Sequence, residues 1–198
     1  MNLSIRRLLL VMTVVLSTAC TQSMVMEVSS EIPTAATDSA EQAVGLYLNS
    51  AFKNFIYQEN TPERQNWEIH LGASQAKLFE QIFNAIYGEV LVVSSNTDES
   101  AFDLFVTPRL IEMQLATPTE TGFSFFEAWL NYQVTIKSIE NSTSRSFVMT
   151  AYGKQNTARF QRFQNGLHQA IENALRDAGA KLTVELTSTP VAENSPKG

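Results

Sequence analysis

The feature that most constrains the fold is a long alternating stretch, residues 123–139, in which apolar and aromatic side chains recur at every second position. One parity carries Phe126, Ala128, Leu130, Tyr132, Val134 and Ile136. The other parity carries Phe125, Glu127, Trp129 and Asn131. A period of two is typical of a β-strand, because successive side chains point to opposite faces of the sheet. We therefore expect one long strand with at least one face in the core.

Two other stretches have the period of an amphipathic helix. In residues 73–87 the apolar face is Ala76, Phe79, Ile82, Phe83 and Ile86. In residues 158–178 it is Phe160, Phe163, Leu167, Ile171, Ala174 and Ala178. Ser74 is the expected N-cap of the first helix and Gly88 its expected end. Residues 181–186 fit either a short final strand or an extension of the second helix.

Shorter extended stretches predict further strands at residues 43–48, 67–71, 89–95, 101–116 and 146–152. Residues 51–57 fit a strand or a helical turn. Pro108 indicates a sheet edge or a bulge, because proline has no backbone N–H for the strand ladder. These elements predict an α+β fold, a mostly antiparallel sheet with two amphipathic helices packed on one face.

The N-terminus has the layout of a secretory signal. Arg6 and Arg7 precede an apolar run of about nine residues, 8–16, and small residues follow. A membrane-spanning helix needs about 20 apolar residues, so this run is too short to cross a bilayer. We therefore expect residues 1–19 to be a cleaved signal peptide.

The segment from Leu16 to Cys20 resembles the lipobox of bacterial lipoproteins, although Ser17 stands where leucine is usual. The resemblance implies cleavage before Cys20 and acylation of its thiol, which is the site residue that we predict. Cys20 is the only cysteine, so it has no internal disulfide partner. By the same resemblance, Thr21 in place of an aspartate implies the periplasmic face of the outer membrane. The alternative is an ordinary signal peptide in which Cys20 is incidental.

Composition divides the rest of the chain and excludes one class of partner. Residues 20–40 are rich in Ser, Thr and Ala and predict a lipidated flexible tether, with a short strand at 24–28 left open. Residues 41–187 predict a single α+β periplasmic domain, and 188–198 a disordered tail. Removing Arg6 and Arg7 with the signal leaves 12 basic against 20 acidic residues, a net charge of −8. That balance argues against nucleic acid as a partner.

No catalytic, metal or cofactor motif occurs in the sequence, and we predict that the protein is not an enzyme. The two histidines are expected on polar surfaces, His70 in a strand and His168 one helical turn from Glu172. Arg109 and Glu112 are expected to form a surface ion pair. Glu112, Glu120 and Glu127 could supply paired carboxylates, but acidic side chains at sheet edges more often serve solvation and edge protection, which is how we interpret them.

Phe125 and Trp129 are the candidate binding residues. They share one face of the long strand, opposite Phe126 and Tyr132. One interpretation is a central strand buried between two layers. The other is a lipid or partner groove on an uncovered sheet face.

Beyond the lipobox, the late strand and amphipathic helix of residues 151–180 resemble those of small Gram-negative lipoproteins. The families are the YajG type, the LPS-assembly lipoprotein and the auxiliary lipoproteins of ABC transporters. The resemblance implies a membrane-anchored, non-enzymatic accessory protein that binds an envelope protein or lipid in assembly or transport. One alternative is a structural subunit that oligomerises through its sheet edges. A remote alternative is a periplasmic hydrolase, with His70 or His168 beside a carboxylate in a polar cleft.

Overall fold

The structure is a computed structural model, and it describes residues 24–27, 42–61, 64, 66–93, 97–159 and 163–188. Its main sheet has the strand order β5-β2-β6-β7-β8, and a smaller sheet has the order β1-β4-β3. The main-sheet strands are β2 (Gln42–Tyr47), β5 (Gly88–Val93), β6 (Leu104–Ala116), β7 (Phe125–Ser138) and β8 (Thr143–Asn156). The small-sheet strands are β1 (Met24–Glu27), β3 (Ile56–Glu59) and β4 (Trp67–His70). The helices are α2 (Ser50–Lys53), α3 (Gly72–Tyr87), α4 (Pro118–Thr121) and α5 (Phe163–Ser188), with short 3₁₀ turns η1 (Glu99–Ala101) and η2 (Thr157–Arg159).

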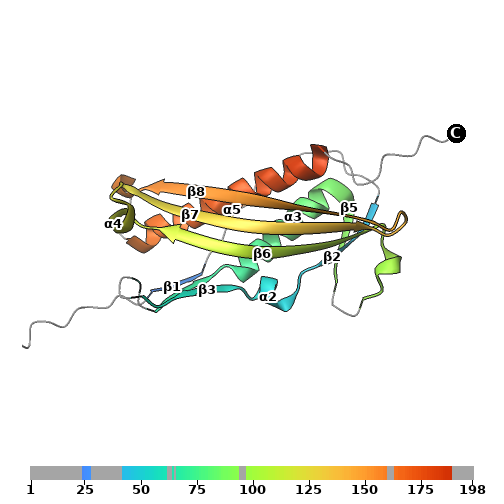
Figure 1. The fold of residues 1–198 in the computed structure, drawn as a ribbon, viewed down its shortest axis with the longest axis horizontal. Coiled ribbons are helices and arrows are strands. Elements are labelled where there is room, and N and C mark those ends of the chain that lie inside the picture. The colour runs from blue at the N-terminus through green and yellow to red at the C-terminus, as the bar shows by residue number, and fades with distance from the viewer. Residues whose placement is uncertain are drawn as a thin grey trace, which may run out of the picture.

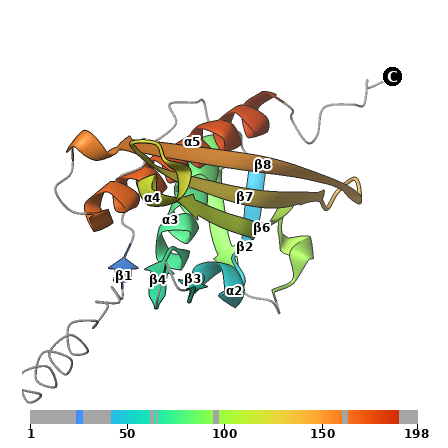
Figure 2. The ribbon, with the colours of Figure 1, turned by 60° about the vertical axis from the view of Figure 1, so that its left-hand side comes forward.

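Both long helices lie on the same side of the main sheet, so the predicted α+β fold is confirmed. Helix α5 packs against β7 and β8, α3 packs against β2 and β5, and the two helices contact each other. In Figure 1 the strands β6, β7 and β8 lie in front of α3 and α5, and Figure 2 shows the same layers from a second side. We call the helix-covered side of β6–β8 the inner face and the opposite side the outer face.

The alternation of β7 sets the boundary between these two faces. Every residue of its apolar parity, from Phe126 to Ile136, is buried against the helices. The residues between them are half-buried on the outer face. Strand β7 pairs antiparallel with β6 on one side and with β8 on the other, so these three long strands form a continuous meander.

The remaining half of the main sheet is parallel, which the sequence did not predict. Strand β2 pairs in parallel with β5 and with the first residues of β6, Leu104–Val106. Beyond Val106 only β7 pairs with β6, and Pro108 lies there, opposite Val134. A bulge follows between Leu110 and Glu112. The edge position expected for Pro108 is therefore confirmed, whereas the bulge lies further along β6 and not at the proline.

Helix α3 matches its prediction except at its start. It begins at Gly72, so Ser74 is the third residue inside the helix, and Ser74 is buried. Ser74 is therefore not the N-cap; Leu71 holds that position without a side-chain hydrogen bond. A Cβ at Gly72 would lie 2.2 Å from the Lys53 carbonyl oxygen, so only glycine allows this entry. Gly88 ends the helix with φ 74°, as expected.

Helix α5 begins later and runs longer than predicted. Residues 157–159 form η2, and residues 181–186 extend the helix rather than form a strand. Its apolar stripe is buried, including Leu167, Ile171 and Ala174. The helix backbone comes very close to β8, because a Cβ at Gly153 would lie 1.9 Å from the Ala170 carbonyl oxygen.

Several terminal predictions fall outside the described residues. These are the signal peptide of residues 1–19, the lipidation of Cys20 and nearly all of the tail at 188–198. Within the segment expected as a tether, residues 24–27 form β1, the short strand that the sequence left open. Among the described helices, none is long and apolar enough to cross a membrane.

Candidate functional site: the outer face of the sheet

The outer face carries an aromatic cluster where β7 and β8 pair. Trp129 lies opposite Tyr152 in the strand register, and their ring centroids are 5.4 Å apart. Phe125 lies on the same face, four residues before Trp129, and all three side chains remain accessible to solvent. Helix α5 covers the inner face behind them, and no described helix covers this side.

Two charged side chains contact these aromatic residues. Lys154 places its Nζ 3.7 Å from the centroid of the Phe125 ring, a cation–π contact. The hydroxyl of Tyr152 donates a hydrogen bond to Glu127, which lies opposite Lys154 in the register. Partial desolvation and the neighbouring Glu127 carboxylate raise the pKa of Tyr152 to about 12, so the phenol remains a donor at neutral pH. Phe125 and Tyr152 are therefore each held by a charged neighbour on the opposite strand.

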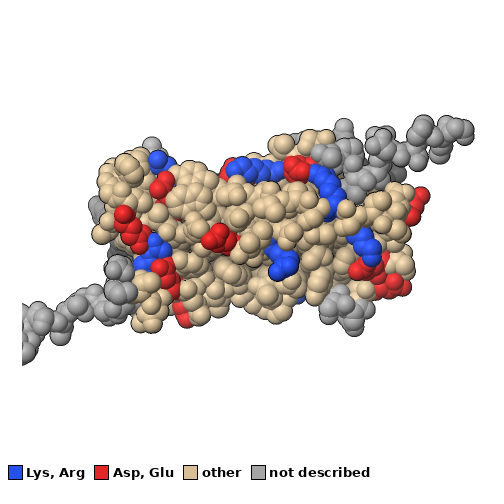
Figure 3. Space-filling model, in the orientation of Figure 1, with Lys and Arg blue, Asp and Glu red and all other residues tan. Residues whose placement is uncertain are grey.

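Away from the aromatic rings, the β7–β8 part of the outer face is mainly made of uncharged polar residues, while Arg109 and Glu112 lie on β6. Thr150 donates to Asn131 over 3.2 Å, and Gln133 donates to Ser146 over 3.2 Å across the same strand pair. Exposed Val148 adds an apolar side chain. Figure 3 views this side of the molecule: the face is mainly uncharged, an acidic and a basic group lie near its middle, and the other charges lie towards its ends and margins. The arrangement suits contact with another surface, because aromatic rings supply apolar area and amides and hydroxyls supply hydrogen bonds.

The structure brings the two predicted binding residues together on this open face. Phe125 and Trp129 lie as expected on the side opposite Phe126 and Tyr132. The interpretation of a strand buried on both sides does not describe β7, because only its inner face is fully buried. Sequence reasoning missed Tyr152 and Lys154. Counting the register back from the β7–β8 turn would have paired them with Trp129 and Glu127.

A second, buried cluster joins the small sheet to α4 and was also missed. Arg64 donates to both carboxylate oxygens of Glu120, over 2.6 and 2.5 Å, and over 2.7 Å to Glu59. Its guanidinium also lies 5.0 Å from the Trp67 ring centroid and donates to the Leu115 carbonyl oxygen. Burial by itself would lower the pKa of Arg64, but its hydrogen bonds to the two carboxylates raise it above the ordinary value.

Glu120 has two roles in that cluster. Its carboxylate binds Arg64 and also accepts hydrogen bonds from the Thr117 backbone N–H and hydroxyl, which completes the capping box of α4. Partial burial opposes its ionisation, but the hydrogen bonds from Arg64 and Thr117 lower its pKa below the ordinary value. The interpretation of Glu120 as a solvated edge residue is therefore wrong, since it is part of a structural ion pair.

The other polar predictions give a mixed result. Arg109 is exposed, and Glu112 accepts a hydrogen bond from Gln114 over 2.7 Å, so the expected Arg109–Glu112 pair does not form. His168 lies 3.9 Å from Glu172, the helical neighbour expected for it. His70 Nδ1 lies 3.3 Å from the Glu27 carboxylate on β1. Among the described residues, no group of three or more His, Cys, Asp and Glu side chains is placed to hold a metal ion.

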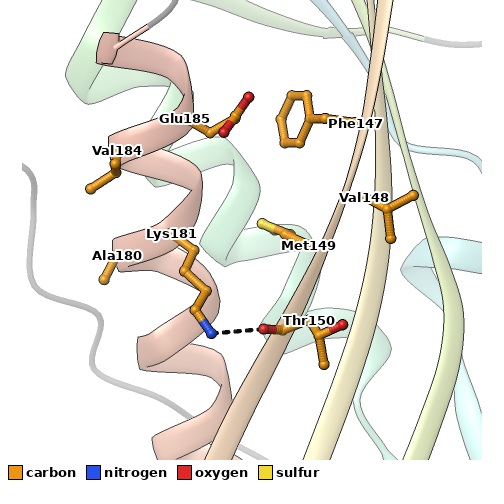
Figure 4. A pocket seen from close by; sticks show the side chains of 8 residues that line it. All are labelled: Phe147, Val148, Met149, Thr150, Ala180, Lys181, Val184 and Glu185. Atoms are coloured by element: carbon orange, nitrogen blue, oxygen red, sulfur yellow. Dashed lines mark hydrogen bonds between the residues drawn. The ribbon is translucent and has the colours of Figure 1, made fainter.

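A groove of about 410 Å³ runs between β8 and the C-terminal half of α5. Figure 4 shows Phe147 and Met149 pointing from the strand towards the helix. The Lys181 ammonium donates to the Thr150 carbonyl oxygen and to Asp177, each over 2.7 Å. Arg145 pairs with Glu185 at the far end. These contacts protect the edge of β8, and the groove holds no histidine or cysteine that would activate a nucleophile.

No sequence family and no curated protein matches this chain. Its fold is similar to that of protein XCC0632 from Xanthomonas campestris, of family DUF330, at 11% identity over 81% of this chain and 92% of that one, with a TM-score of 0.52. A protein from Chlamydia trachomatis, CT253, has 10% identity over 75% of this chain and 99% of that one, with a TM-score of 0.46. A minor lipoprotein from Acinetobacter baumannii has 12% identity over 80% of this chain and 100% of that one, with a TM-score of 0.36. The first likeness shows a shared fold.

Proposed function

We propose that this chain is a lipid-anchored, non-enzymatic accessory protein of the bacterial envelope that binds a protein partner through the outer face of its sheet. Acylated Cys20 would hold it at the periplasmic face of the outer membrane. The observation that carries the proposal is the difference between the two faces of one sheet. The inner face is covered by α3 and α5, while the outer face presents the Phe125–Trp129–Tyr152 cluster to solvent.

The composition of the outer face favours a protein over a lipid as the partner. Tyrosine and tryptophan are enriched at protein interfaces and supply much of the binding energy there. The same face carries a row of amides and hydroxyls, at Asn131, Gln133, Ser146 and Thr150. These groups already pair with one another, but an acyl chain would take water away from their remaining donors and acceptors without replacing it, which is unfavourable. A protein surface has its own polar groups to pair with them.

The binding proposal is tested by site-specific photo-crosslinking in cells. A photoreactive residue at Thr150, beside the aromatic cluster, is expected to give a discrete crosslinked product. Trp129→Ala in the same chain should abolish that product, because it removes the largest ring of the face. A photoreactive residue at Val184, on the exposed side of α5, is the matched control. A product that persists with Trp129→Ala, or that forms equally from position 184, would refute the outer face as the binding surface.

The lipid anchor is tested separately with Cys20→Ser. The unaltered chain should fractionate with the outer membrane, and Cys20→Ser should be soluble. Membrane attachment that persists in Cys20→Ser would rule out the lipid anchor, whatever the crosslinking shows.

One observation favours the alternative of a self-associating subunit. Strand β5 is an edge of the main sheet, and Leu91 and Val92 on it are exposed. An apolar edge strand is prone to pair with another chain. Size-exclusion chromatography with light scattering on the lipid-free body separates the two functions. A monomer fits the accessory role, and an oligomer that Leu91→Lys dissociates fits the alternative.

A further inference from the structure

The starting point is the short distance between the proposed lipid and the folded body. Strand β1 begins at Met24, four residues after Cys20. It pairs in parallel with β4, and Met26 is buried in the core. Four residues of extended chain span at most about 14 Å. An acyl group on Cys20 therefore keeps the start of β1 close to the bilayer surface.

A chain of contacts shows which end of the body this is. Met24 lies opposite Trp67 in the β1–β4 register. Trp67 packs under Arg64, and Arg64 holds Glu120 of α4. The start of β1 and helix α4 therefore lie at the same end of the molecule, as Figure 1 shows. We call this end, from the start of β1 to Phe123, the anchor end.

The anchor end carries two very exposed apolar side chains. Phe123, just after α4, is 67% exposed, and Val25 of β1 is 65% exposed. The charges nearby are neutralised in part, because Arg64 pairs with Glu59 and Glu120. An aromatic ring on a projecting turn beside a lipid attachment point matches the preference of aromatic side chains for the membrane interface.

The body is so long that its two ends lie at different distances from the proposed lipid anchor. Strand β7 has 14 residues and so extends about 45 Å at roughly 3.3 Å per residue. That length is several times the reach from Cys20 to Met24. The β7–β8 turn, at the far end of these strands, therefore lies away from the membrane when the anchor end touches it.

We propose that the anchor end is a membrane-contact surface, with Phe123 inserted among the lipid headgroups and the sheet standing away from the bilayer. This inference rests on the proposed lipid anchor at Cys20. It also orients the folded body relative to the membrane, since the short link from Cys20 and the exposed ring of Phe123 lie at the same end. The outer face then points into the periplasm and is free for a protein partner.

The test uses the full lipidated chain in vesicles of phosphatidylethanolamine and phosphatidylglycerol. Because acylation occupies the thiol of Cys20, a second cysteine takes a nitroxide label alone. Phe123→Cys labels the anchor end. Val184→Cys is the matched control, being 64% exposed and 21 residues into α5, about 31 Å from the helix start. Val148→Cys labels the outer face.

The readout is the collision rate of each label with oxygen, which enters lipid, and with a water-soluble nickel complex. The label at 123 is expected to gain collisions with oxygen and lose collisions with nickel, while those at 184 and 148 behave as in water. A flexible Gly-Ser spacer of about 20 residues between Thr21 and Met24 should return the label at 123 to water, because it removes the length limit.

Four outcomes would overturn the inference. If the label at 123 behaves as in water although the protein floats with the vesicles, the contact is refuted and the lipid anchor stands. Protection of that label from both reagents would mean that protein, such as a second copy, covers it. Lipid contact at 148 would mean that the body lies on its sheet. Mass spectrometry that finds Cys20 unacylated would refute the anchor itself.

Discussion

The two faces of β7 are built from one run of residues and yet differ in almost every physical respect. On the inner face, Leu130 and Tyr132 are fully buried against the helices. On the outer face, Trp129 and Asn131 are half-exposed, and their side chains contact Tyr152 and Thr150 on β8. The comparison indicates that the residues of one parity of β7 stabilise the fold, while those of the other parity are available for binding. Substitutions on one face should act on unfolding, and those on the other on binding.

The largest expected difference in the free energy of unfolding is between variants of two adjacent residues on opposite faces. Leu130→Ala should lower the free energy of unfolding by about 2–5 kcal/mol, because it leaves a cavity in the core. Asn131→Ala, one residue further on, should change it by only about 0.5 kcal/mol. Urea unfolding followed by circular dichroism measures both. Equal losses would mean that the outer face is buried by something that the fold does not show.

The next effect compares two tyrosine hydroxyls. The Tyr132 hydroxyl donates to the buried Gln75 side chain over 3.2 Å, and Gln75 donates to the Phe52 carbonyl oxygen. Tyr132→Phe leaves the Gln75 oxygen without this donor and should lower the free energy of unfolding by about 1–3 kcal/mol. Tyr152→Phe removes a hydroxyl that water can replace and should have a much smaller effect. The same unfolding experiment measures both variants. A larger loss of unfolding free energy for Tyr152→Phe than for Tyr132→Phe would contradict the assignment of the faces.

A smaller effect on the free energy of unfolding is expected for Glu120 at the anchor end. The hydrogen bonds from Arg64 and Thr117 lower the pKa of Glu120 in the folded state. The ionised Glu120 carboxylate therefore contributes its full stabilisation of the folded state above the ordinary carboxyl pKa. That contribution is lost as the pH falls through the lowered value. Glu120→Gln should be less stable than the unaltered chain at neutral pH, and the difference should shrink in acid. A difference that grows on acidification would show the opposite sign of the pKa shift.

The smallest effect concerns the cation–π contact on the outer face. Lys154→Gln removes the ammonium above the Phe125 ring and should lower the free energy of unfolding by about 0.5 kcal/mol, the lower end for an exposed contact. Lys77→Gln on the exposed side of α3 is the control, with no change expected. Thermal unfolding monitored in parallel for both variants resolves the difference. A loss for Lys154→Gln no larger than that for Lys77→Gln would contradict the contact, and a loss several-fold larger than expected would mean that Lys154 also supports the β8 edge.

The sequence predicted the pattern of each element well and the partners of each strand poorly. Alternation in β7 and the helical period of α3 depend on local residues, so both were found. The parallel pairing of β2 with β5 and β6 depends on long-range geometry that no local period encodes. Strand β1 has only four residues, which is too short for a period to show.

The residues of the candidate site were likewise predictable only where local sequence decides their position. Phe125 and Trp129 were assigned to one face because parity along a single strand decides it. Tyr152 required the β7–β8 register. The Arg64 cluster required contacts between a loop, the small sheet and α4, which lie far apart in the sequence. Glu120 was misread for that reason, since nothing near it in the sequence indicates its partner.

The split pairing of the main sheet also bears on the order in which the chain assembles. The β6–β7–β8 meander joins neighbours along the chain, so its hairpins close over short loops. Strand β2 is made early but finds its partners only when α3, β5 and β6 have followed. Because loop closure slows with the length of the intervening chain, we expect the C-terminal hairpins to nucleate folding. The earliest-synthesised strand of the main sheet would then be among the last to find its place.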